Sequence, residues 1–326
     1  MQKKIVLILL FLWGCVQLPH SNGVVNEVII FCSPEDKESI APAIQSLFGK
    51  KINTPQPESV INVKWGDPWE FDTYCYQPNL MILSLDFPLD STGDHLFTRF
   101  KTVQKTDEKI FVAENIYAVH QQVIGINAHD AVELEIMLNE KGPWILQELN
   151  NAIDSNIWDY IQSKDEHINL IHTVRNHFGF EIFIQEDYKE IQQEDEFLWI
   201  GRGYPYRWLT FMYADKIDFK HIDSAWRALE LLFLENMPSI KISEFFREKE
   251  KIQIDGVTVK AMRGIYDHNE SQTGGPFFIY IFDGQTPEAV ILVGGFVNNP
   301  GLDKILLLRQ LEVIVQNMKS IKESNE

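Results

Sequence analysis

The sequence predicts an α+β protein of two domains. In its first half, short apolar runs alternate with segments whose apolar residues recur every three or four positions, as in strands separated by helices. In its second half, short aromatic-rich runs follow one another between turn residues, which is typical of antiparallel strands. These patterns favour a small layered α/β domain over residues 24–165 and an antiparallel sheet flanked by helices over residues 166–322.

The strands and the first helix of the N-terminal domain follow from its apolar residues. The apolar runs predict strands at residues 25–31, 60–63, 79–85 and 117–126. A helix over residues 38–48 is expected after the first strand, and Gly49 ends it. Residues 50–58 are rich in proline and polar side chains, so they predict a loop.

Two further helices are expected before the domain ends. Asn127 is a candidate N-cap for a helix that begins near Asp130. Gly142 and Pro143 interrupt this pattern, and proline suits the first turn of a helix. We therefore expect Pro143 to open a separate helix, whose apolar stripe covers residues 146–161.

The C-terminal domain is expected to begin after the charged residues 163–167. Its strands are predicted at residues 180–184, 197–200, 208–213, 257–265, 277–282 and 289–296. A helix is predicted over residues 223–236, and Asp283-Gly284 is a hairpin signal. In the last helix, Asn299 is the expected cap and Pro300 fits the first turn. The buried stripe of this helix is Ile305, Leu308, Leu311, Val315 and Met318.

The amino terminus has the features of an exported lipoprotein. Lys3 and Lys4 precede an apolar run over residues 5–13, which is too short to cross a hydrocarbon core of about 30 Å as a helix. The motif Leu12-Trp13-Gly14-Cys15 resembles a bacterial lipobox, in which the signal is cleaved before a cysteine that is then acylated. We expect residues 1–14 to be the signal peptide, Cys15 the lipidation site, and 15–23 a tether. The alternative is an ordinary signal peptide with an incidental cysteine.

The net charge of the chain limits the classes of partner that it is expected to bind. The 326 residues include 29 basic and 47 acidic side chains, a net charge of −18. Nucleic acid is excluded as an expected partner, because binding to phosphates needs lysine and arginine. The same charge disfavours electrostatic docking on an anionic membrane surface. The membrane is therefore expected as a partner only through the N-terminal lipid, with the acidic body facing the aqueous compartment.

Two cysteines remain after the lipidation site. Cys32 and Cys75 would lie in a compartment that permits disulfides. A bridge between them and a pair of buried thiols both fit the sequence.

Several short motifs together resemble one family. They are Leu18-Pro19-His20-Ser21-Asn22-Gly23, Asn26-Glu27-Val28, Phe178-Gly179-Phe180, Phe197-Leu198-Trp199, Gly274-Gly275-Pro276-Phe277, Gly295-Phe296-Val297 and Pro300-Gly301-Leu302-Asp303-Lys304. In this order and spacing they resemble the domain-of-unknown-function 4837 family of Bacteroidetes-type lipoproteins. The resemblance implies a lipid-anchored envelope protein; it supplies no established reaction and no catalytic residues. The second half also resembles the Mog1/PsbP-like sandwich. Acidic residues after the anchor mark surface export in such bacteria, and Val16-Gln17-Leu18 lacks them, so a periplasm-facing location is expected in either membrane.

Catalytic and metal-binding patterns are missing from the sequence. It contains no Gly-x-Ser-x-Gly elbow, Walker loop or His-Glu-x-x-His helix. His167, His172 and His177 are five residues apart and cannot share one helical face, so solvated or capping roles are expected for them. A nucleophilic Cys32 with His120 or His129 as its base is an alternative that no spacing supports. We therefore expect no catalytic residue, no metal and no cofactor.

Aromatic residues in loops are the strongest candidates for a binding surface. The candidates are Trp65, Trp69, Tyr74, Tyr76, Tyr204, Tyr206 and Trp208. Such side chains offer a large contact area to another envelope protein, a peptide or a glycan, although they can equally fill the domain cores. The expected function is a non-catalytic binding or assembly factor of the envelope. The alternatives are an exported hydrolase whose site is assembled from scattered residues, and a carrier of a glycan or lipid.

Overall fold

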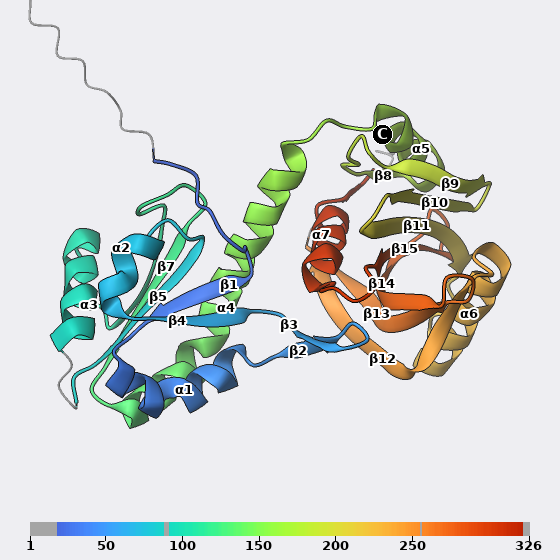
Figure 1. Cartoon of the computed structure of the whole chain (residues 1–326). Coiled ribbons are helices and arrows are strands. Elements are labelled where there is room, and N and C mark those ends of the chain that lie inside the picture. The colour runs from blue at the N-terminus through green and yellow to red at the C-terminus, as the bar shows by residue number, and fades with distance from the viewer. Residues whose placement is uncertain (1–17, 88–90, 255, 322–326) are drawn as a thin grey trace, which may run out of the picture.

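The computed structural model describes residues 18–87, 91–254 and 256–321. The strands of one sheet come from residues 27–128 and those of another from residues 189–298, and helices lie between and around them (Figure 1). This arrangement confirms the predicted α+β class. The predicted signal peptide and Cys15 lie outside the described residues. Within the described ranges, no helix is long and apolar enough to span a bilayer.

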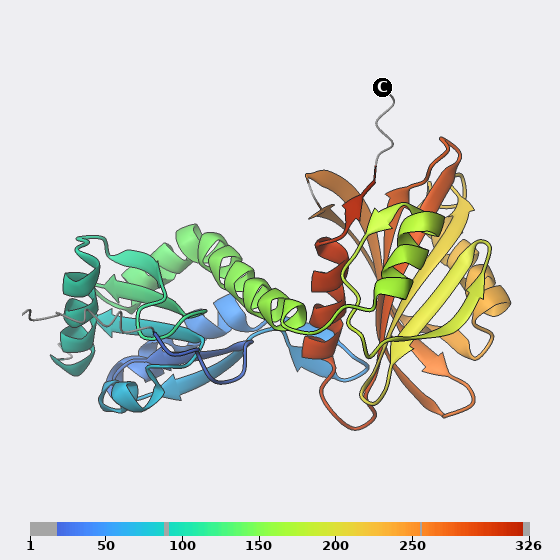
Figure 2. The same ribbon diagram turned by 90° about the horizontal axis from the view of Figure 1, so that it is seen from above.

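The N-terminal half contains a mostly parallel sheet between two helical layers (Figure 2). The sheet order is β4 (Asn62–Gly66), β1 (Glu27–Phe31), β5 (Asn79–Leu85), β7 (Gln122–Ala128) and β6 (Ile110–Glu114), of which β6 is antiparallel. Alternate strand residues pack against helices α1 (Pro34–Phe48) and α4 (Ala131–Gln162) on one face. The other face packs against α2 (Phe71–Tyr74) and α3 (Ser91–Gln104). Every residue of β5 is buried, as expected for a strand covered on both faces.

Helix α4 runs without a break through Gly142 and Pro143, so the predicted interruption is wrong. The predicted cap is also wrong, because the Asp130 carboxylate, not Asn127, accepts hydrogen bonds from the first turn. A proline inside a helix costs about 3 kcal/mol. Buried side chains on both sides of Pro143, such as Leu138 and Ile145, hold the helix on the sheet and outweigh this cost.

The segment predicted as a loop over residues 50–58 is a β-hairpin. Its strands are β2 (Lys51–Asn53) and β3 (Pro57–Ser59). The hairpin extends from the N-terminal sheet to the other half of the molecule (Figure 1). The prediction failed because proline and polar residues are also compatible with a short, exposed hairpin.

The C-terminal half contains an antiparallel sheet, seven-stranded within the described residues. Its order is β12 (Ile240–Ile254), β13 (Val257–His268), β14 (Thr273–Asp283), β15 (Ala289–Asn298), β11 (Tyr206–Asp215), β10 (Phe197–Arg202) and β9 (Lys189–Glu194). Helix α6 (Ile222–Asn236) covers one face. Helices α5 (Ile168–Phe178) and α7 (Ile305–Gln316) cover the other. The predicted strand over residues 180–184 is reduced to β8 (Phe180–Glu181), which pairs with β16 (Lys319–Ser320).

The last helix starts later than the sequence predicts. Asn299 and Pro300 lie in a turn before α7, so they are neither its cap nor its first turn. The Asn299 side chain instead donates a hydrogen bond to the carbonyl of Asp303, at 2.8 Å. All five predicted stripe residues are buried, from Ile305 to Met318. Apolar spacing therefore located the helix, whereas the capping pattern did not.

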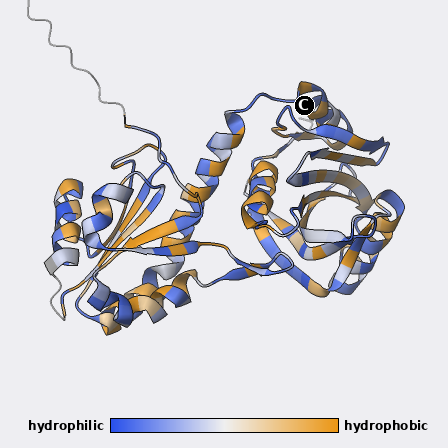
Figure 3. Cartoon of the chain, in the orientation of Figure 1, coloured by the Kyte–Doolittle hydropathy of each residue, from blue (hydrophilic) through white to orange (hydrophobic). Residues whose placement is uncertain are grey.

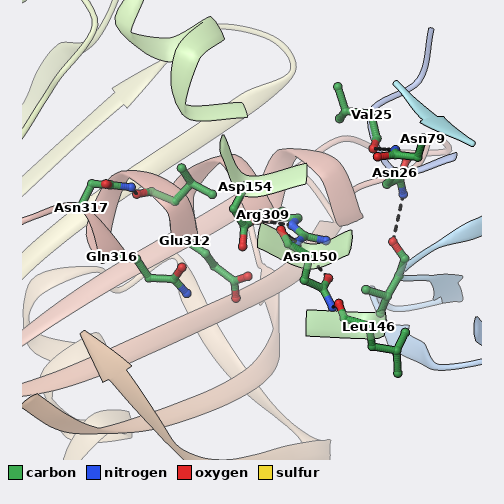
Figure 4. Close-up of polar contacts among 12 residues, drawn as sticks. Val25, Asn26, Asn79, Leu146, Asn150, Asp154, Arg309, Glu312, Gln316 and Asn317 are labelled. Atoms are coloured by element: carbon green, nitrogen blue, oxygen red, sulfur yellow. Dashed lines mark hydrogen bonds and ion pairs between the residues drawn. The ribbon is translucent and has the colours of Figure 1, made fainter. Parts of the chain in front are cut away.

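The two halves share a core and a polar joint. Among the described residues, one hydrophobic cluster includes side chains of both sheets and of α4 and α7, and Figure 3 shows apolar residues along the facing sides of these elements. The Glu58 carboxylate, on the β2–β3 hairpin, accepts hydrogen bonds from the backbone N–H groups of Lys304 (2.7 Å) and Ile305 (2.8 Å) at the start of α7. Arg309 of α7 donates to Asp154 (2.6 Å) and Asn150 (2.9 Å) of α4 (Figure 4).

Candidate ligand cleft

A polar cleft of about 830 Å³ lies at the side of the N-terminal half. Its walls are the first described residues of the chain, the turn that joins β6 to β7, and one face of α4. The lining residues are Leu18, His20, Glu114, Asn115, Val119, His120, Gln121, Gln122, Glu148, Asn151, Ala152, Ser155 and Asn156.

The N-terminal segment is bonded to this wall. Ser21 donates its backbone N–H to Val119 (3.1 Å), and Val119 donates to Pro19 (2.8 Å). The Ser21 hydroxyl donates to the carbonyl of His120, and the Asn22 backbone N–H donates to Tyr76. These bonds fix the segment as part of the fold from residue 19 onward.

The turn between β6 and β7 holds two non-glycine residues in the left-handed region. Asn115 has φ of 54° and His120 has φ of 60°. The Asn115 side chain accepts the His120 backbone N–H at 2.7 Å, and the Gln121 side chain accepts that of Tyr117 at 3.0 Å. Gln121 also donates to the carbonyl oxygens of two earlier residues, which ties the turn to the sheet. Residues that surrounding hydrogen bonds hold in a strained backbone conformation, as Asn115 and His120 are here, are concentrated at functional sites.

His120 is the most connected side chain at one end of the cleft. Its Nδ1 lies 2.9 Å from Oδ2 of Asp159 on α4. Its ring stacks on His20, with ring centroids 5.6 Å apart and planes 13° apart. Its carbonyl accepts from the Asn156 side chain at 3.1 Å. A histidine oriented by a carboxylate can act as a base, but the nearby Ser21 hydroxyl bonds to the main chain of His120 and not to its ring.

Gln122 joins the β6–β7 pair to α4 in the wall of the cleft. Glu114 is the register partner of Gln122 across the β6–β7 pair, and the Gln122 side chain donates to the carbonyl of Glu148 at 3.1 Å. Gln122 therefore lies beside Glu114 in the sheet and is bonded to the main chain of Glu148 on α4. The carbonyl oxygen of the Gln122 side chain is buried and has no hydrogen-bond partner among the described residues. Of the residues that line the cleft, none is a lysine or arginine.

Helix α4 forms a wall shared by the cleft and the joint. Asn150 and Asp154 face Arg309 of α7. The cleft is lined by Asn151 and Ser155, among others, and at about 100° per residue these side chains project from a different side of the helix. The same helix thus connects the cleft to the C-terminal half.

The predicted aromatic residues do not form one surface. Trp65, Trp69, Tyr74 and Tyr76 lie on and after β4, whereas Tyr204, Tyr206 and Trp208 lie at the β10–β11 turn of the other sheet. Trp69 and Tyr76 are exposed, but Trp65 and Tyr74 are half-buried beneath lysine side chains. None of these residues lines the cleft.

The second aromatic group forms a ladder of ring contacts. Ring centroids are 5.9 Å apart between Tyr204 and Tyr206, and 6.2 Å apart between Tyr206 and Trp208. Tyr204 and Tyr206 are exposed, whereas Trp208 is buried against Trp199 and Tyr266. Of these three residues, Trp208 therefore fills the domain core, which is the alternative to a binding surface that the sequence allows.

The structure does not join Cys32 to Cys75. Both are buried thiols, and no disulfide links them. Cys32 belongs to the cluster on the α1 and α4 face of the sheet, and Cys75 to the cluster on the opposite face. Burial, the largest cause, and the nearby Asp72 raise the pKa of the Cys75 thiol. The alternative pairing of Cys32 with His120 is also wrong, because Cys32 is in the core and His120 bonds to Asp159.

The histidine group of the sequence has a local role. The His167 ring accepts the backbone N–H of Leu170 at 3.3 Å and caps α5, which is one of the expected roles. Among the described residues, no three His, Cys, Asp or Glu side chains are grouped closely enough to hold a metal ion.

The residues that build the cleft were not predicted from the sequence. His20, His120 and Asp159 come from three distant segments, and no motif links them. The one sequence signal was the family-like segment that contains His20. It was read as part of a tether.

Comparisons with solved structures give only distant likenesses. A protein of Bacteroides thetaiotaomicron VPI-5482 is 10% identical with a TM-score of 0.29, and the match covers 45% of this chain and 47% of that chain. This chain thus spans less than half the length of that protein. The Saccharomyces cerevisiae Ran-binding protein Mog1p is 7% identical, with a TM-score of 0.31 over 45% of this chain and 92% of Mog1p. LpqN of Mycobacterium tuberculosis, involved in cell envelope biogenesis, is 12% identical, with a TM-score of 0.29 over 48% of this chain and 97% of LpqN.

The comparison with protein families gives a match in the C-terminal part of the chain. No curated protein matches the sequence. Residues 235–317 match the family model of DUF4837. This range contains the motifs at 274–277, 295–297 and 300–304, whereas the motifs before residue 235 lie outside it. The similarity to DUF4837, a domain of unknown function, thus covers residues 235–317, about a quarter of the chain.

Proposed function

We propose that the protein is a lipid-anchored lipoprotein of the bacterial cell envelope that faces the periplasm and acts as a non-catalytic binding or assembly factor. The observation that supports this function is the cleft beside the docked N-terminal segment. A lipobox-like motif ends at Cys15, three residues before Leu18, which lines the cleft. An anchor and a binding site would therefore lie next to each other in the same protein.

The docked segment shortens the reach of the anchor. Residues 19–22 are bonded to the fold, so the chain between Cys15 and Leu18 is the part available as a spacer. At about 3.3–3.6 Å per residue, these three steps span at most about 11 Å. The cleft would thus lie close to the membrane surface, which suits a factor that binds its ligand at the membrane.

Binding fits the cleft better than hydrolysis does. The His120–Asp159 pair, with a distance of 2.9 Å, has the geometry of a base and its orienting carboxylate. A hydrolase would also need a nucleophile bonded to the His120 ring, whereas among the described residues the ring contacts Asp159 and His20. A lipid-tail carrier is not favoured, because most of the residues that line the cleft are polar and few are large and apolar.

The anchor is tested by replacing Cys15 with serine. We expect the parent protein to fractionate with membranes and to incorporate a labelled fatty acid, and the Cys15→Ser variant to lose both properties. A variant that fractionates and labels like the parent would show that the lipoprotein proposal is wrong.

The binding role is tested by crosslinking in cells. A photo-crosslinking residue at Asn151, an exposed position in the cleft wall, should capture a reproducible product. The matched control carries the same residue at Glu288, which is exposed in the C-terminal half. Identical products from both positions, or none from Asn151, would count against a ligand in the cleft.

A further inference from the structure

Two arginines lie directly opposite each other in the C-terminal sheet. Arg202 of β10 and Arg207 of β11 are register partners, so their side chains project from the same face. Like charges in this arrangement destabilise a sheet, and Asp187 offsets one of them by an ion pair with Arg202. Arg207 forms no ion pair with a described carboxylate and donates instead to the neutral side chain of Gln310 on α7, at 2.5 Å. One of the two positive charges therefore has no counter-ion within the described part of the chain.

The uncompensated charge of Arg207 is also partly buried. The residue is half-buried, and its Nε has neither solvent contact nor a hydrogen-bond partner among the described residues. Burial, the largest cause, and the neighbouring Arg202 guanidinium lower the pKa of Arg207, as expected for a cation that lacks an anion. Because the attraction between charges acts over several ångströms, an anion beside the guanidinium would relieve this cost without touching Nε.

Two hydrogen-bond donors beside this charge have no partner in the described ranges. The first is Nη2 of Arg207, which, unlike Nε, is not fully buried. The second is the hydroxyl of Tyr188, a side chain that is 1% exposed and that lies beneath Arg202, whose guanidinium carbon is 5.8 Å from the centre of the ring. Burial raises the pKa of this hydroxyl to about 12, and the charges of Arg207 and Arg202 oppose the rise, so the hydroxyl lies near both guanidinium groups. Guanidinium N–H and tyrosine O–H groups both donate to oxyanions.

We propose that Arg207, Arg202 and Tyr188 form a binding site for a singly charged oxyanion, a carboxylate or a phosphodiester, which a ligand presents. Two guanidinium groups and the Asp187 carboxylate give the site one net positive charge, and a monoanion neutralises it. None of these residues lines the polar cleft. The inference is therefore independent of the proposed anchor and of the cleft.

The first test titrates three small probes into the full chain, purified in a non-ionic detergent, at constant ionic strength in a calorimeter. Acetate and dimethyl phosphate each carry one negative charge, whereas acetamide has the shape of acetate without the charge. We expect at least one anion to bind saturably, with a dissociation constant on the order of 1–10 mM for so small a ligand, and acetamide not to bind. The anion that binds more tightly identifies the chemical group. If neither anion binds saturably, or if acetamide binds as tightly as the anions, the proposal is wrong.

Variants assign the binding to the arginine pair. Arg207→Gln removes the uncompensated charge and should weaken anion binding at least tenfold. Tyr188→Phe keeps the ring and both charges but removes one donor, so it should weaken binding about threefold to tenfold; it gives an independent test if Arg207→Gln does not fold. The matched control is Arg227→Gln, because Arg227 is exposed on α6 and also forms no ion pair with a described carboxylate. If both site variants remain folded by circular dichroism and bind like the parent, or if the control loses binding equally, the arginine pair is not the site.

The second test separates a bound anion from general screening by salt. A ligand that binds the folded protein raises its Tm, whereas chloride at the same ionic strength supplies only screening. The tighter of the two anions should therefore raise the Tm of the parent above its value in sodium chloride, and it should not do so in Arg207→Gln. Equal Tm values for the parent in both salts would overturn the proposal, because screening would then account for the whole effect.

Discussion

Replacing Glu58 with alanine perturbs the polar joint between the two halves of the protein. The Glu58 carboxylate accepts the backbone N–H groups of Lys304 and Ile305, so it acts as the N-cap of α7 from a hairpin 246 residues earlier in the chain. The variant leaves both N–H groups without this acceptor. It also removes a negative charge from the positive end of the helix dipole.

The size of the loss can be estimated from these contacts. Loss of a capping side chain costs about 0.5–2 kcal/mol, and loss of a charge at a helix terminus costs about 0.3–1 kcal/mol. Glu58 is half-buried, so water replaces part of what is lost. We expect Glu58→Ala to lower the free energy of unfolding by about 2 kcal/mol, and Glu58→Gln, which keeps an acceptor oxygen, by about 1 kcal/mol.

Urea denaturation followed by tryptophan fluorescence measures both losses. Glu288→Ala is the matched control, because this exposed glutamate makes no side-chain hydrogen bond or ion pair with any described residue. We expect the control to stay within about 0.5 kcal/mol of the parent. A Glu58→Ala variant as stable as the control would refute the capping argument.

Three further expectations follow from packing, burial and thiol placement. Gly275→Ala should lose more than about 3 kcal/mol of stability in urea, because its Cβ would lie 1.9 Å from the Val297 carbonyl oxygen; unchanged stability would contradict this. Burial raises the pKa of Tyr188 to about 12, above the value of about 10 in the unfolded chain, so the stability that this group contributes is full below pH 10 and falls between pH 10 and 12 by up to about 1.4 kcal/mol per pH unit. Burial also raises the pKa values of Tyr266 and Tyr280, so these groups add to the loss above pH 10. Tyr188→Phe should flatten this fall, and curves parallel to the parent's would show that another group causes it. Without reductant, Cys32 and Cys75 should both be alkylated after denaturation, and a disulfide-linked peptide pair in the digest would contradict the buried thiols.

Local sequence patterns predicted the buried elements well. The strand predicted at residues 79–85 has those bounds, because five of its seven residues are apolar, which is typical of a strand that is buried on both faces. Elements with polar faces were missed. The long edge strand β12 carries charged residues on both faces and a bulge between Ile242 and Arg247, so no alternation of apolar and polar residues marks it.

The cleft was less predictable than the fold, because it depends on contacts between residues that are far apart in the sequence. The His20–His120 stack joins residues 100 positions apart and the His120–Asp159 contact joins residues 39 positions apart, and each forms only when the sheet is assembled. The left-handed conformations of Asn115 and His120 depend on hydrogen bonds within the turn. Histidine spacing along the chain singled out His167, His172 and His177, for which solvated or capping roles are expected, and it gave no sign of the contact between His20 and His120.

The capping of α7 by Glu58 has a consequence for the order of events during synthesis. Ribosomes add about 5–20 residues per second, so the 246 positions between Glu58 and Lys304 take about 12–50 s to appear. Throughout that interval the hairpin has no helix to bind, and the Glu58 carboxylate has its local bond from the Thr54 hydroxyl but not the two from α7. In a nascent chain that stalls before residue 304, the N-terminal half therefore lacks its bonds to α7. A protease or chaperone can distinguish this exposed hairpin from the bonded hairpin of the finished protein.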